Sequence, residues 1–366
     1  MKAICSRKDL FEGVQTAGRA VSSRSSLPIL GHLLIRSEED RLRIAATDLE
    51  IGMECTVQSS VQEHGCLTAP ARILTEVLSA LPDADVAISV DESNVVNLKC
   101  GSSDYTILGL PAEDFPMLPE VKDDVSFKIE KAILREGIKK TIFAVSTEEA
   151  RPQLTGILLI LDGESIKLVS TDTHRLCVQD SPIITGQGEA HAIIPQRAMA
   201  ELSRLLLDED GDVSINISPS QILFRVDDIS MVSRLIEGQF PNYERVIPAE
   251  YDKTLTVPTM DFLQSMRRVA IVARENSNRA VLRTVDDKLV ATAESGSVGK
   301  AYEEMEMVKE GEDVEIAFNA KYLLDMLSVM DTEAVEMRLT GSLSPGIMKG
   351  QGLEDYLYVV MPMQIT

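Results

Sequence analysis

The segment LRIAATDLE, residues 42–50, decides the fold, because the chain contains it three times. It returns as IKLVSTDTH at residues 166–174 and, more weakly, as LVATAESGS at residues 289–297. The copies begin 124 and 123 residues apart. Self-similarity at a fixed period is the signature of a repeated structural unit, so we expect a chain built from copies of one module.

Two further markers keep the same period. The stretch TAPARILTEVL from Thr68 is matched by IIPQRAMAELSRLL from Ile193 and by AFNAKYLLDML from Ala317. The stretch DFPMLPEV from Asp114 is matched by QFPNYERVIP from Gln239. Proline-rich connections follow this last marker, and they predict three modules at residues 1–121, 122–248 and 249–366.

Each module contains two amphipathic segments and several alternating ones. Apolar residues three and four apart, such as Leu10, Val14 and Ala17, indicate a helix, and alternating stretches such as residues 86–90 indicate strands. The expected helices are residues 7–22, 70–81, 131–146, 195–207, 259–274 and 319–330. The predicted fold class is therefore α+β, with three tandem copies of two helices backed by antiparallel sheet.

The composition excludes several classes of protein. With 366 residues and 44% hydrophobic residues, the chain can bury sizeable cores. Aromatic residues make up 4% and Trp is absent, which argues against a platform that stacks on bases. The five cysteines are scattered, and no apolar run approaches the ~18 residues of a membrane span. We therefore expect a cytoplasmic protein without a disulfide framework or a membrane partner.

The sequence also lacks the patterns of an enzyme. None of the four histidines has metal-ligand spacing to another His or to a Cys, and no nucleotide-binding or nucleophile motif is present. Asp48 and Asp172 occupy equivalent repeat positions, and Ser295 replaces them in the third copy. Duplicated residues of this kind favour a structural turn or cap. We expect no catalysis, no metal and no cofactor.

Charge is distributed unevenly along the chain. The net charge is −22, yet the six helical segments hold 14 basic and 7 acidic residues, so they carry +7 and the remainder −29. Lys131, Arg135 and Lys139 recur at helical spacing and share one face. A basic helical surface on an acidic body favours phosphate binding there. For any one helix a solvated outer face is an equal alternative, and a triplicated acidic scaffold that binds only proteins is the competing function.

The width of a helix limits how such a basic surface could surround a duplex. If the six helices of one chain line a pore, at ~10 Å each they give it a circumference of ~60 Å and a bore of ~19 Å, which is too narrow for hydrated DNA. Twelve helices give a bore of ~38 Å. A DNA-encircling function therefore requires two chains, closed head to tail.

Several stretches together resemble one family, the bacterial DNA polymerase III β subunits or sliding clamps. They are SLPILGHLLI, STDTHRL, AEDFPMLPE, GQFPNYERVIP and the terminal YVVMPM, and the likeness covers the whole chain. The resemblance implies a DNA clamp fold that closes into a six-domain ring as a homodimer. It also implies a non-catalytic processivity factor that encircles duplex DNA and tethers the replicative polymerase, the clamp loader and other replication and repair proteins.

The resemblance implies a pocket in which these partners dock short peptide motifs. Leu343 is the least secure member, because the local sequence LSPGIMKGQG departs from the family pattern. Apart from the resemblance, a terminal VVMPM is also typical of a final strand. The implied pocket residues are Arg151, Thr171, His174, Arg175, Leu176, Pro241, Arg245, Val246, Tyr322, Leu343, Val359, Val360, Met361, Pro362 and Met363.

The resemblance further implies DNA contacts and a dimer seam. The contacts would be to phosphates, because a ring that read bases could not slide. Pro152 and Gln153 stand where the family often has aromatic residues, which argues against stacking there. The implied DNA-contacting residues are Arg24, Arg72, Gln153 and Arg197, with the helical Lys131, Arg135 and Lys139. The implied seam packs Tyr105 and Ile107 against Ile271 and Val272, for which ordinary core packing is the alternative.

Overall fold

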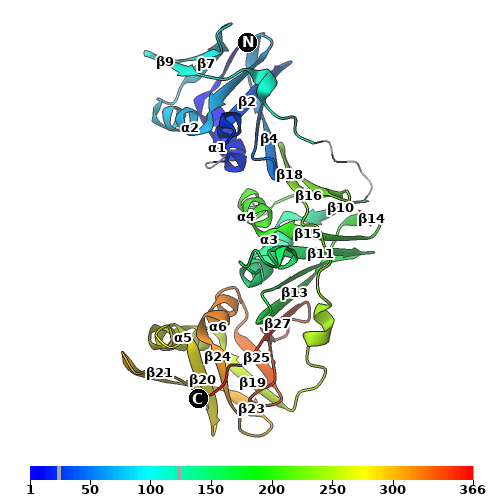
Figure 1. Ribbon diagram of the computed structural model, residues 1–366, viewed down its shortest axis with the longest axis vertical. Coiled ribbons are helices and arrows are strands. Elements are labelled where there is room, and N and C mark those ends of the chain that lie inside the picture. The colour runs from blue at the N-terminus through cyan, green and yellow to red at the C-terminus, as the bar shows by residue number, and fades with distance from the viewer. Residues whose placement is uncertain (23–25, 120, 122–124, 209, 366) are drawn as a thin grey trace. The chain divides into compact units, whose positions relative to one another are not determined.

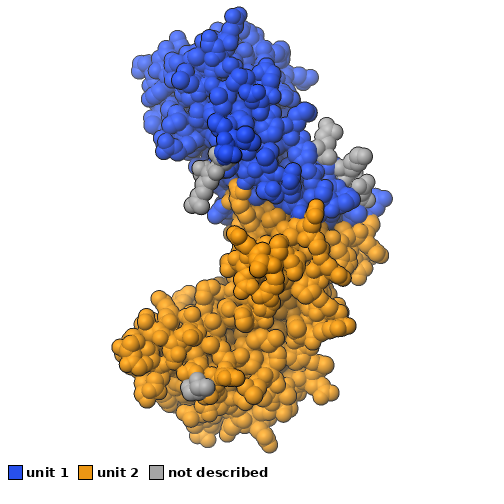
Figure 2. All heavy atoms as spheres, viewed as in Figure 1, with its two compact units in different colours: residues 1–130, 185–187, 204–235 blue, residues 131–184, 188–203, 236–366 orange. Residues whose placement is uncertain are grey.

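The computed structural model covers residues 1–366 and describes all of them except 23–25, 120, 122–124, 209 and 366. The chain forms two compact units (Figure 2). The first unit consists of Met1–Glu130, Thr185–Gln187 and Arg204–Leu235. The second consists of Lys131–Ile184, Gly188–Ser203 and Ile236–Thr366.

In the described part of the first unit the strands form two antiparallel sheets. The strand order of the smaller sheet is β5 (Ser60–Glu63), β1 (Lys2–Ser6), β7 (Asp85–Val90), β8 (Val95–Cys100) and β9 (Ser103–Leu108). The order of the larger sheet is β14 (Thr185–Gln187), β10 (Val125–Glu130), β16 (Asp212–Ile217), β17 (Gln221–Val226), β18 (Ile229–Arg234), β4 (Ile51–Gln58), β3 (Arg41–Thr47), β2 (His32–Glu38) and β6 (Cys66–Pro70).

The helices α1 (Arg7–Ala17) and α2 (Ala71–Ala80) lie side by side in this unit (Figure 1). The apolar face predicted for α1 is the buried face, because Leu10, Val14 and Ala17 are all 0% exposed. It packs mainly against β4. The Ser6 hydroxyl caps the helix by accepting the Asp9 N–H at 3.4 Å.

The described part of the second unit also has two antiparallel sheets. The order of the larger sheet is β15 (Ala190–Pro195), β11 (Gly156–Asp162), β12 (Ser165–Thr171), β13 (Arg175–Pro182), β27 (Tyr356–Val360), β26 (Gly346–Gly350), β25 (Ala334–Leu339), β19 (Lys253–Pro258) and β23 (Val308–Glu310). The order of the smaller sheet is β22 (Gly299–Glu306), β21 (Lys288–Ser295), β20 (Arg279–Val285) and β24 (Glu315–Asn319).

The helices of the second unit cover these sheets. α3 (Lys131–Thr141) packs against β12 and β13, while α5 (Thr259–Ala273) and α6 (Ala320–Leu327) lie side by side (Figure 1). α4 (Gln196–Leu205) directly follows β15. Phe262, Met266 and Val269 of α5 are 0% exposed and belong to a large apolar core.

The prediction of an α+β fold with a helical pair in each repeat is confirmed. All six expected helices are shorter than predicted, and α1 and α3 differ most, since α1 ends at Ala17 and α3 ends at Thr141. Short 3₁₀ turns follow them, η1 (Gly18–Ala20) and η4 (Ile142–Ala144). Ala20 and Ala144 are 0% exposed, so apolar residues continue to face the core while the backbone tightens. The spacing of apolar residues alone does not distinguish an α-helix from a 3₁₀ turn.

Neighbouring repeats share their larger sheets. In the first unit β18 pairs with β4, which places Val232 opposite Gly52. In the second unit β27 pairs with β13, which places Val359 opposite Leu176. This pairing explains why the two compact units do not divide at the module boundaries near residues 121 and 248, which stay a prediction.

Candidate functional site

The turn between β12 and β13 is held by its own side chains. Asp172 Oδ1 accepts the backbone N–H groups of His174 at 2.9 Å and Arg175 at 3.0 Å. The Thr171 hydroxyl donates to the Arg175 carbonyl at 2.7 Å and accepts the Thr173 N–H at 3.1 Å. Thr173 has a φ of 75°, a conformation that persists only where surrounding contacts fix it. Asp172 is therefore structural, as its repetition predicts.

The first repeat forms the same turn between β3 and β4. Asp48 Oδ1 accepts the N–H groups of Glu50 at 3.0 Å and Ile51 at 2.8 Å. The Thr47 hydroxyl donates to the Ile51 carbonyl at 2.9 Å, and Leu49 has a φ of 78°. Each turn contains one left-handed residue and precedes the strand, β4 or β13, that pairs with a strand of the neighbouring repeat.

The third repeat keeps the same register with a different residue at the turn. Pro195 and Asn319, which directly precede α4 and α6, pair with Gly156 and Arg279. Leu158 pairs with Val169 in the second repeat, and Val281 pairs with Thr292 in the third. Ser295 therefore corresponds to Asp172, as the sequence repeat predicts, and its hydroxyl accepts the Ser297 N–H at 3.3 Å as Asp172 accepts the His174 N–H.

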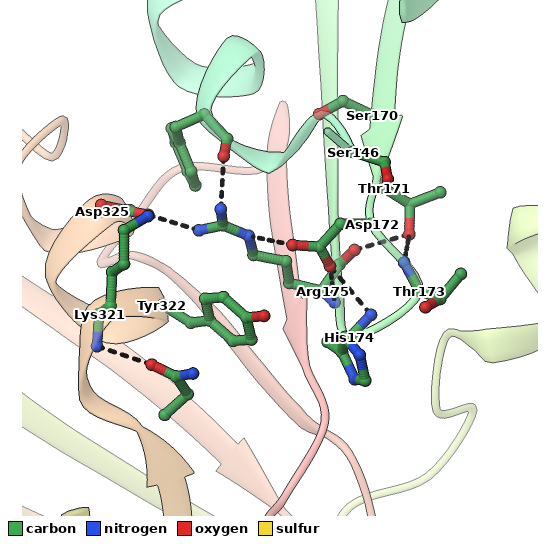
Figure 3. Close-up of polar contacts among 12 residues, drawn as sticks. Ser146, Ser170, Thr171, Asp172, Thr173, His174, Arg175, Lys321, Tyr322 and Asp325 are labelled. Atoms are coloured by element: carbon green, nitrogen blue, oxygen red, sulfur yellow. Dashed lines mark hydrogen bonds and ion pairs between the residues drawn. The ribbon is translucent and has the colours of Figure 1, made fainter. Parts of the chain in front are cut away.

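Arg175 is a buried cation that connects this turn to α6 (Figure 3). Its Nε donates to Asp172 Oδ2 at 2.9 Å, its Nη1 to Asp325 Oδ2 at 2.6 Å and its Nη2 to the Phe143 carbonyl at 2.6 Å. The guanidinium also lies 4.4 Å from the centre of the Tyr322 ring. A charge that is 6% exposed requires such partners.

Electrostatics keep Arg175 charged. Burial by itself would lower the pKa of the guanidinium, but Tyr358 and the carboxylates of Asp325 and Asp172 raise this pKa above its ordinary value. Tyr322 also stacks on His174, with ring centres 6.4 Å apart. Hydrogen bonds and ring contacts join the turn, the cation and α6 into one rim.

A groove lies beside this rim, and we name it groove A. Its volume is about 150 Å³, well below the ~300 Å³ of a small-molecule site, so it suits one or a few side chains of a peptide. The pairing of β13 with β27 forms its wall, and the Met361 N–H donates to the His174 carbonyl at 2.8 Å. The residues that line groove A are Thr171, Thr173, Arg175, Leu176, Pro241, Asn242, Tyr243, Val246, Val359 and Met361.

The structure brings part of the predicted pocket into this lining. The predicted residues that line groove A are Thr171, Arg175, Leu176, Pro241, Val246, Val359 and Met361. His174 and Tyr322 form the rim, Arg151 pairs with Glu148 at 2.5 Å, and Leu343 is 74% exposed on the loop after β25. The other predicted residues, outside the lining, are Arg245, Val360, Pro362 and Met363.

Two of those residues have structural contacts of their own. Val360 is 0% exposed and lies in the core, opposite Arg175 in the sheet. The Met363 N–H donates to the Ala317 carbonyl at 2.7 Å, which fixes the end of the chain to β24. Thr173, Asn242 and Tyr243 line the groove and were not predicted. The motif FPNYERV contains two of them, so including the whole run would have found them.

The residues expected to contact DNA differ in exposure. Arg72, Arg197 and Lys321 each occupy the second position of a helix, namely α2, α4 and α6. The Arg72 side chain is 82% exposed and lies 3.7 Å from Glu76. Lys139 is also exposed, while Arg135 and Gln153 are partly exposed.

Two of the expected DNA-contacting residues remain, Lys131 and Arg24. Lys131 is 2% exposed, so its ammonium group cannot reach a phosphate and we leave it out of the contact set. Arg24 lies outside the described residues.

The residues expected at the seam also separate into two groups. Tyr105 is 40% exposed and Ile271 is 61% exposed. Ile107 is 7% exposed and Val272 packs against the core of the second unit, so both fit the core-packing alternative. The neighbouring Leu108, which was not among the expected seam residues, is 75% exposed. Strand alternation points it away from the core, whereas the apolar pattern alone could not show which residue faces outward.

Among the described residues, no cluster of three or more His, Cys, Asp and Glu side chains is arranged to hold a metal ion. No helix in that part of the chain is long and apolar enough to cross a membrane.

Comparison with protein families matches almost the whole chain in three consecutive parts. The N-terminal domain of DNA polymerase III beta subunit matches residues 1–119, the central domain residues 128–242 and the C-terminal domain residues 244–364. The beta sliding clamp of Synechocystis sp. is 33% identical over 390 aligned residues, covering 100% of both chains. That of Staphylococcus aureus is 31% identical and covers 94% of both.

Solved structures give the same result. The DNA polymerase sliding clamp of Bacillus subtilis superposes with a TM-score of 0.96 at 28% identity. The DNA polymerase III subunit beta of Pseudomonas aeruginosa superposes with a TM-score of 0.95 at 33% identity. Both comparisons cover 100% of each chain.

Proposed function

This chain belongs to the DNA polymerase III beta subunit family, the beta sliding clamps, and from that premise we propose that two copies close head to tail into a ring that encircles duplex DNA. The ring tethers the replicative polymerase and other replication and repair proteins, and thereby confers processivity. The observation that carries the proposal is the ordered match of all three clamp domains along the chain.

The basic helices support the contact with DNA. The second position of α2, α4 and α6 carries Arg72, Arg197 and Lys321 in an otherwise acidic chain of net charge −22. Repeated cations at equivalent positions provide phosphate contacts without base reading, which is the property that sliding requires. Arg135 and Lys139 extend the proposed contact set along α3, and Gln153 belongs to it as a polar residue.

Two free sheet edges support the head-to-tail closure. β9 ends one sheet of the first unit, and β22 ends one sheet of the second. Edge strands with exposed apolar side chains associate readily unless they are covered. β9 exposes Tyr105 and Leu108, β22 exposes Tyr302 at 59%, and α5, which packs against β22, exposes Ile271. We therefore propose a seam between β9 of one copy and β22 of the other.

Groove A supports the docking of partner peptides. Its floor is apolar, with Leu176 and Val359 each 2% exposed, and Val246 at its margin is 41% exposed. Met361 adds an adaptable side chain that suits several different peptides. We propose that the polymerase and the clamp loader use this groove in turn, with Arg151, His174, Arg245, Tyr322 and Leu343 at its margin.

The same proposal assigns no reaction to the chain. The repeated aspartates Asp48 and Asp172 are occupied by backbone N–H groups of their own turns, which leaves them a structural role. We propose a non-catalytic, cofactor-free protein of the bacterial cytoplasm, where its DNA and polymerase partners are present.

Negative-stain imaging of the purified protein tests the ring. We expect particles with a central hole wide enough for a duplex. Sedimentation should give a mass of twice the 40.2 kDa chain. A compact particle without a hole would overturn the DNA-encircling mechanism and favour the acidic scaffold.

A peptide-binding measurement tests groove A separately. Val246→Asp places a charge at the exposed margin, so we expect it to weaken a polymerase C-terminal peptide by at least ~10-fold, since each factor of ten is ~1.4 kcal/mol. Ile184→Asp, at a residue that is 46% exposed and outside the groove lining, is the matched control in the same unit. Equal affinities for the two variants would show that the peptide binds elsewhere.

A further inference from the structure

The first unit contains a second groove with the same frame as groove A, and we name it groove B. Its volume is about 160 Å³. In groove A the Met361 N–H donates to the His174 carbonyl at 2.8 Å, and in groove B the Arg234 N–H donates to the Glu50 carbonyl at 2.9 Å. Both grooves lie beside a turn with the same side-chain hydrogen bonds and one left-handed residue.

Most of the groove B lining is equivalent to groove A by repeat position. Thr47 and Thr171 take equal places in the two turns. Val232 pairs with Gly52 across β18 and β4, as Val359 pairs with Leu176 across β27 and β13. The equivalent residues that line groove B are Thr47, Leu49, Ile51, Gly52, Val232 and Arg234.

Leu118, which lines the adjoining hollow, packs against Gly52 of groove B. A Cβ atom on Gly52 would lie 2.6 Å from Leu118 Cδ2 and 2.9 Å from Val232 Cγ1. The Leu118 side chain therefore occupies the space that Leu176 fills in the other repeat. Met117 is 93% exposed and Leu49 is 45% exposed at the margins, so groove B keeps apolar contact surface.

The hollows that adjoin the two grooves differ in charge, while groove A itself is lined by Arg175 and groove B by Glu50 and Arg234. Tyr243 of groove A also lines an adjoining hollow of about 350 Å³ with four carboxylates and one lysine: Asp162, Asp180, Glu189, Glu244 and Lys167. Met117, Pro119 and Val232 of groove B also line an adjoining hollow of about 670 Å³. Its charged residues are Arg36, Arg43, Arg225, Glu54 and Glu113.

Arg43 beside groove B pairs with Glu38 at 3.0 Å and with Glu54 at 3.1 Å, whereas Arg225 and Arg234 are available to an anionic ligand. Arg225 Nη1 donates to Asn216 Oδ1 at 2.6 Å, which is a neutral partner. Arg234 lies 3.9 Å from Glu50, and both side chains are at least 60% exposed, so this ion pair is weak. An acidic side chain of a ligand can therefore pair with either arginine at small cost.

We propose that groove B is a second docking site on each chain, for an extended partner peptide with an apolar anchor next to acidic residues. The equivalent frame supplies the apolar contact, and the arginines select the charge. Because the hollow beside groove A holds mostly carboxylates and the hollow beside groove B mostly arginines, the two sites favour partners of different charge. One ring can then hold two kinds of partner at once.

Methyl NMR with ¹³C-labelled methionine tests this directly. Met117 lies at groove B and Met361 at groove A, so one spectrum reports on each site separately, and their signals are assigned with Met117→Leu and Met361→Leu. The probes are acetyl-Leu-Phe-Asp-Glu-Asp-amide and acetyl-Leu-Phe-Lys-Lys-Lys-amide. We expect the acidic probe to shift the Met117 methyl signal and the lysine probe to leave it unchanged.

Charge reversal provides the control. Arg234→Glu should lower the affinity of the acidic probe, read from the Met117 signal, at least 10-fold. Lys2→Glu, an equal charge change at an exposed residue outside the groove, should leave that affinity unchanged. A Met117 signal that stays fixed at saturating acidic probe, or that responds equally in both variants, would overturn the proposal. The Met361 signal is independent of this outcome, so failure at groove B is distinguishable from failure at groove A.

Discussion

Replacing Arg175 by Met is the most informative single change, because it removes the cation and keeps most of the side-chain volume. Arg175 is 6% exposed and bonds Asp172, Asp325 and the Phe143 carbonyl. Met cannot replace any of these three donors. The two carboxylates are then left near the core without their shared cation.

The expected loss of stability depends on the hydrogen-bond partners that each carboxylate keeps in Arg175→Met. Breaking a buried ion pair costs about 3–5 kcal/mol. Asp172 keeps two backbone N–H donors, and Asp325 keeps Lys321 Nζ at 3.1 Å. Their side chains are 15% and 24% exposed, so water also solvates the two carboxylates. We therefore take the lower end, about 3 kcal/mol, which means that the turn opens roughly 10²-fold more often.

Native-state hydrogen exchange measures this opening at the amides of His174 and Arg175. These N–H groups donate to Asp172, so their exchange should accelerate by roughly 10²-fold in Arg175→Met. Arg268→Met is the control, because Arg268 bonds Glu303 at 2.8 and 2.6 Å but its side chain is 53% exposed. Unchanged exchange at His174 in Arg175→Met would refute the argument that the buried cation holds the turn.

Three further predictions concern other parts of the molecule. Gly52→Ala should lower the free energy of unfolding by about 1 kcal/mol through crowding against Leu118, whereas Gly18→Ala, with nothing within 4 Å, should be neutral in a thermal scan. Leu108→Asp should reduce the mass in sedimentation from twice the 40.2 kDa chain to one chain, and a persistent dimer would exclude β9 from the seam. Iodoacetamide at pH 8 should modify the exposed Cys66, as mass spectrometry can check, and modification of a buried thiol would contradict the packing. Burial raises the pKa to about 12 at each of Cys5, Cys55 and Cys177.

Local patterns in the sequence were sufficient to locate the helices α1 to α6, to indicate strands and to show the threefold repeat. A helix that packs on a sheet must place apolar residues three and four apart, so the spacing of Leu10, Val14 and Ala17 predicts both the helix and its buried face. Repetition of Asp48 and Asp172 predicts a structural turn, which the hydrogen bonds confirm. These properties depend on residues close together in the chain.

The sites depend on residues far apart in the chain, and only the tertiary structure decided them. Arg175 and Asp325 are separated by 150 positions, and the pairing of β13 with β27 brings Leu176 opposite Val359. No local pattern shows that Lys131 and Lys140 are buried while Lys139 of the same helix is exposed. Side-chain direction is set by strand register and by packing between distant elements, which spacing along the chain does not encode.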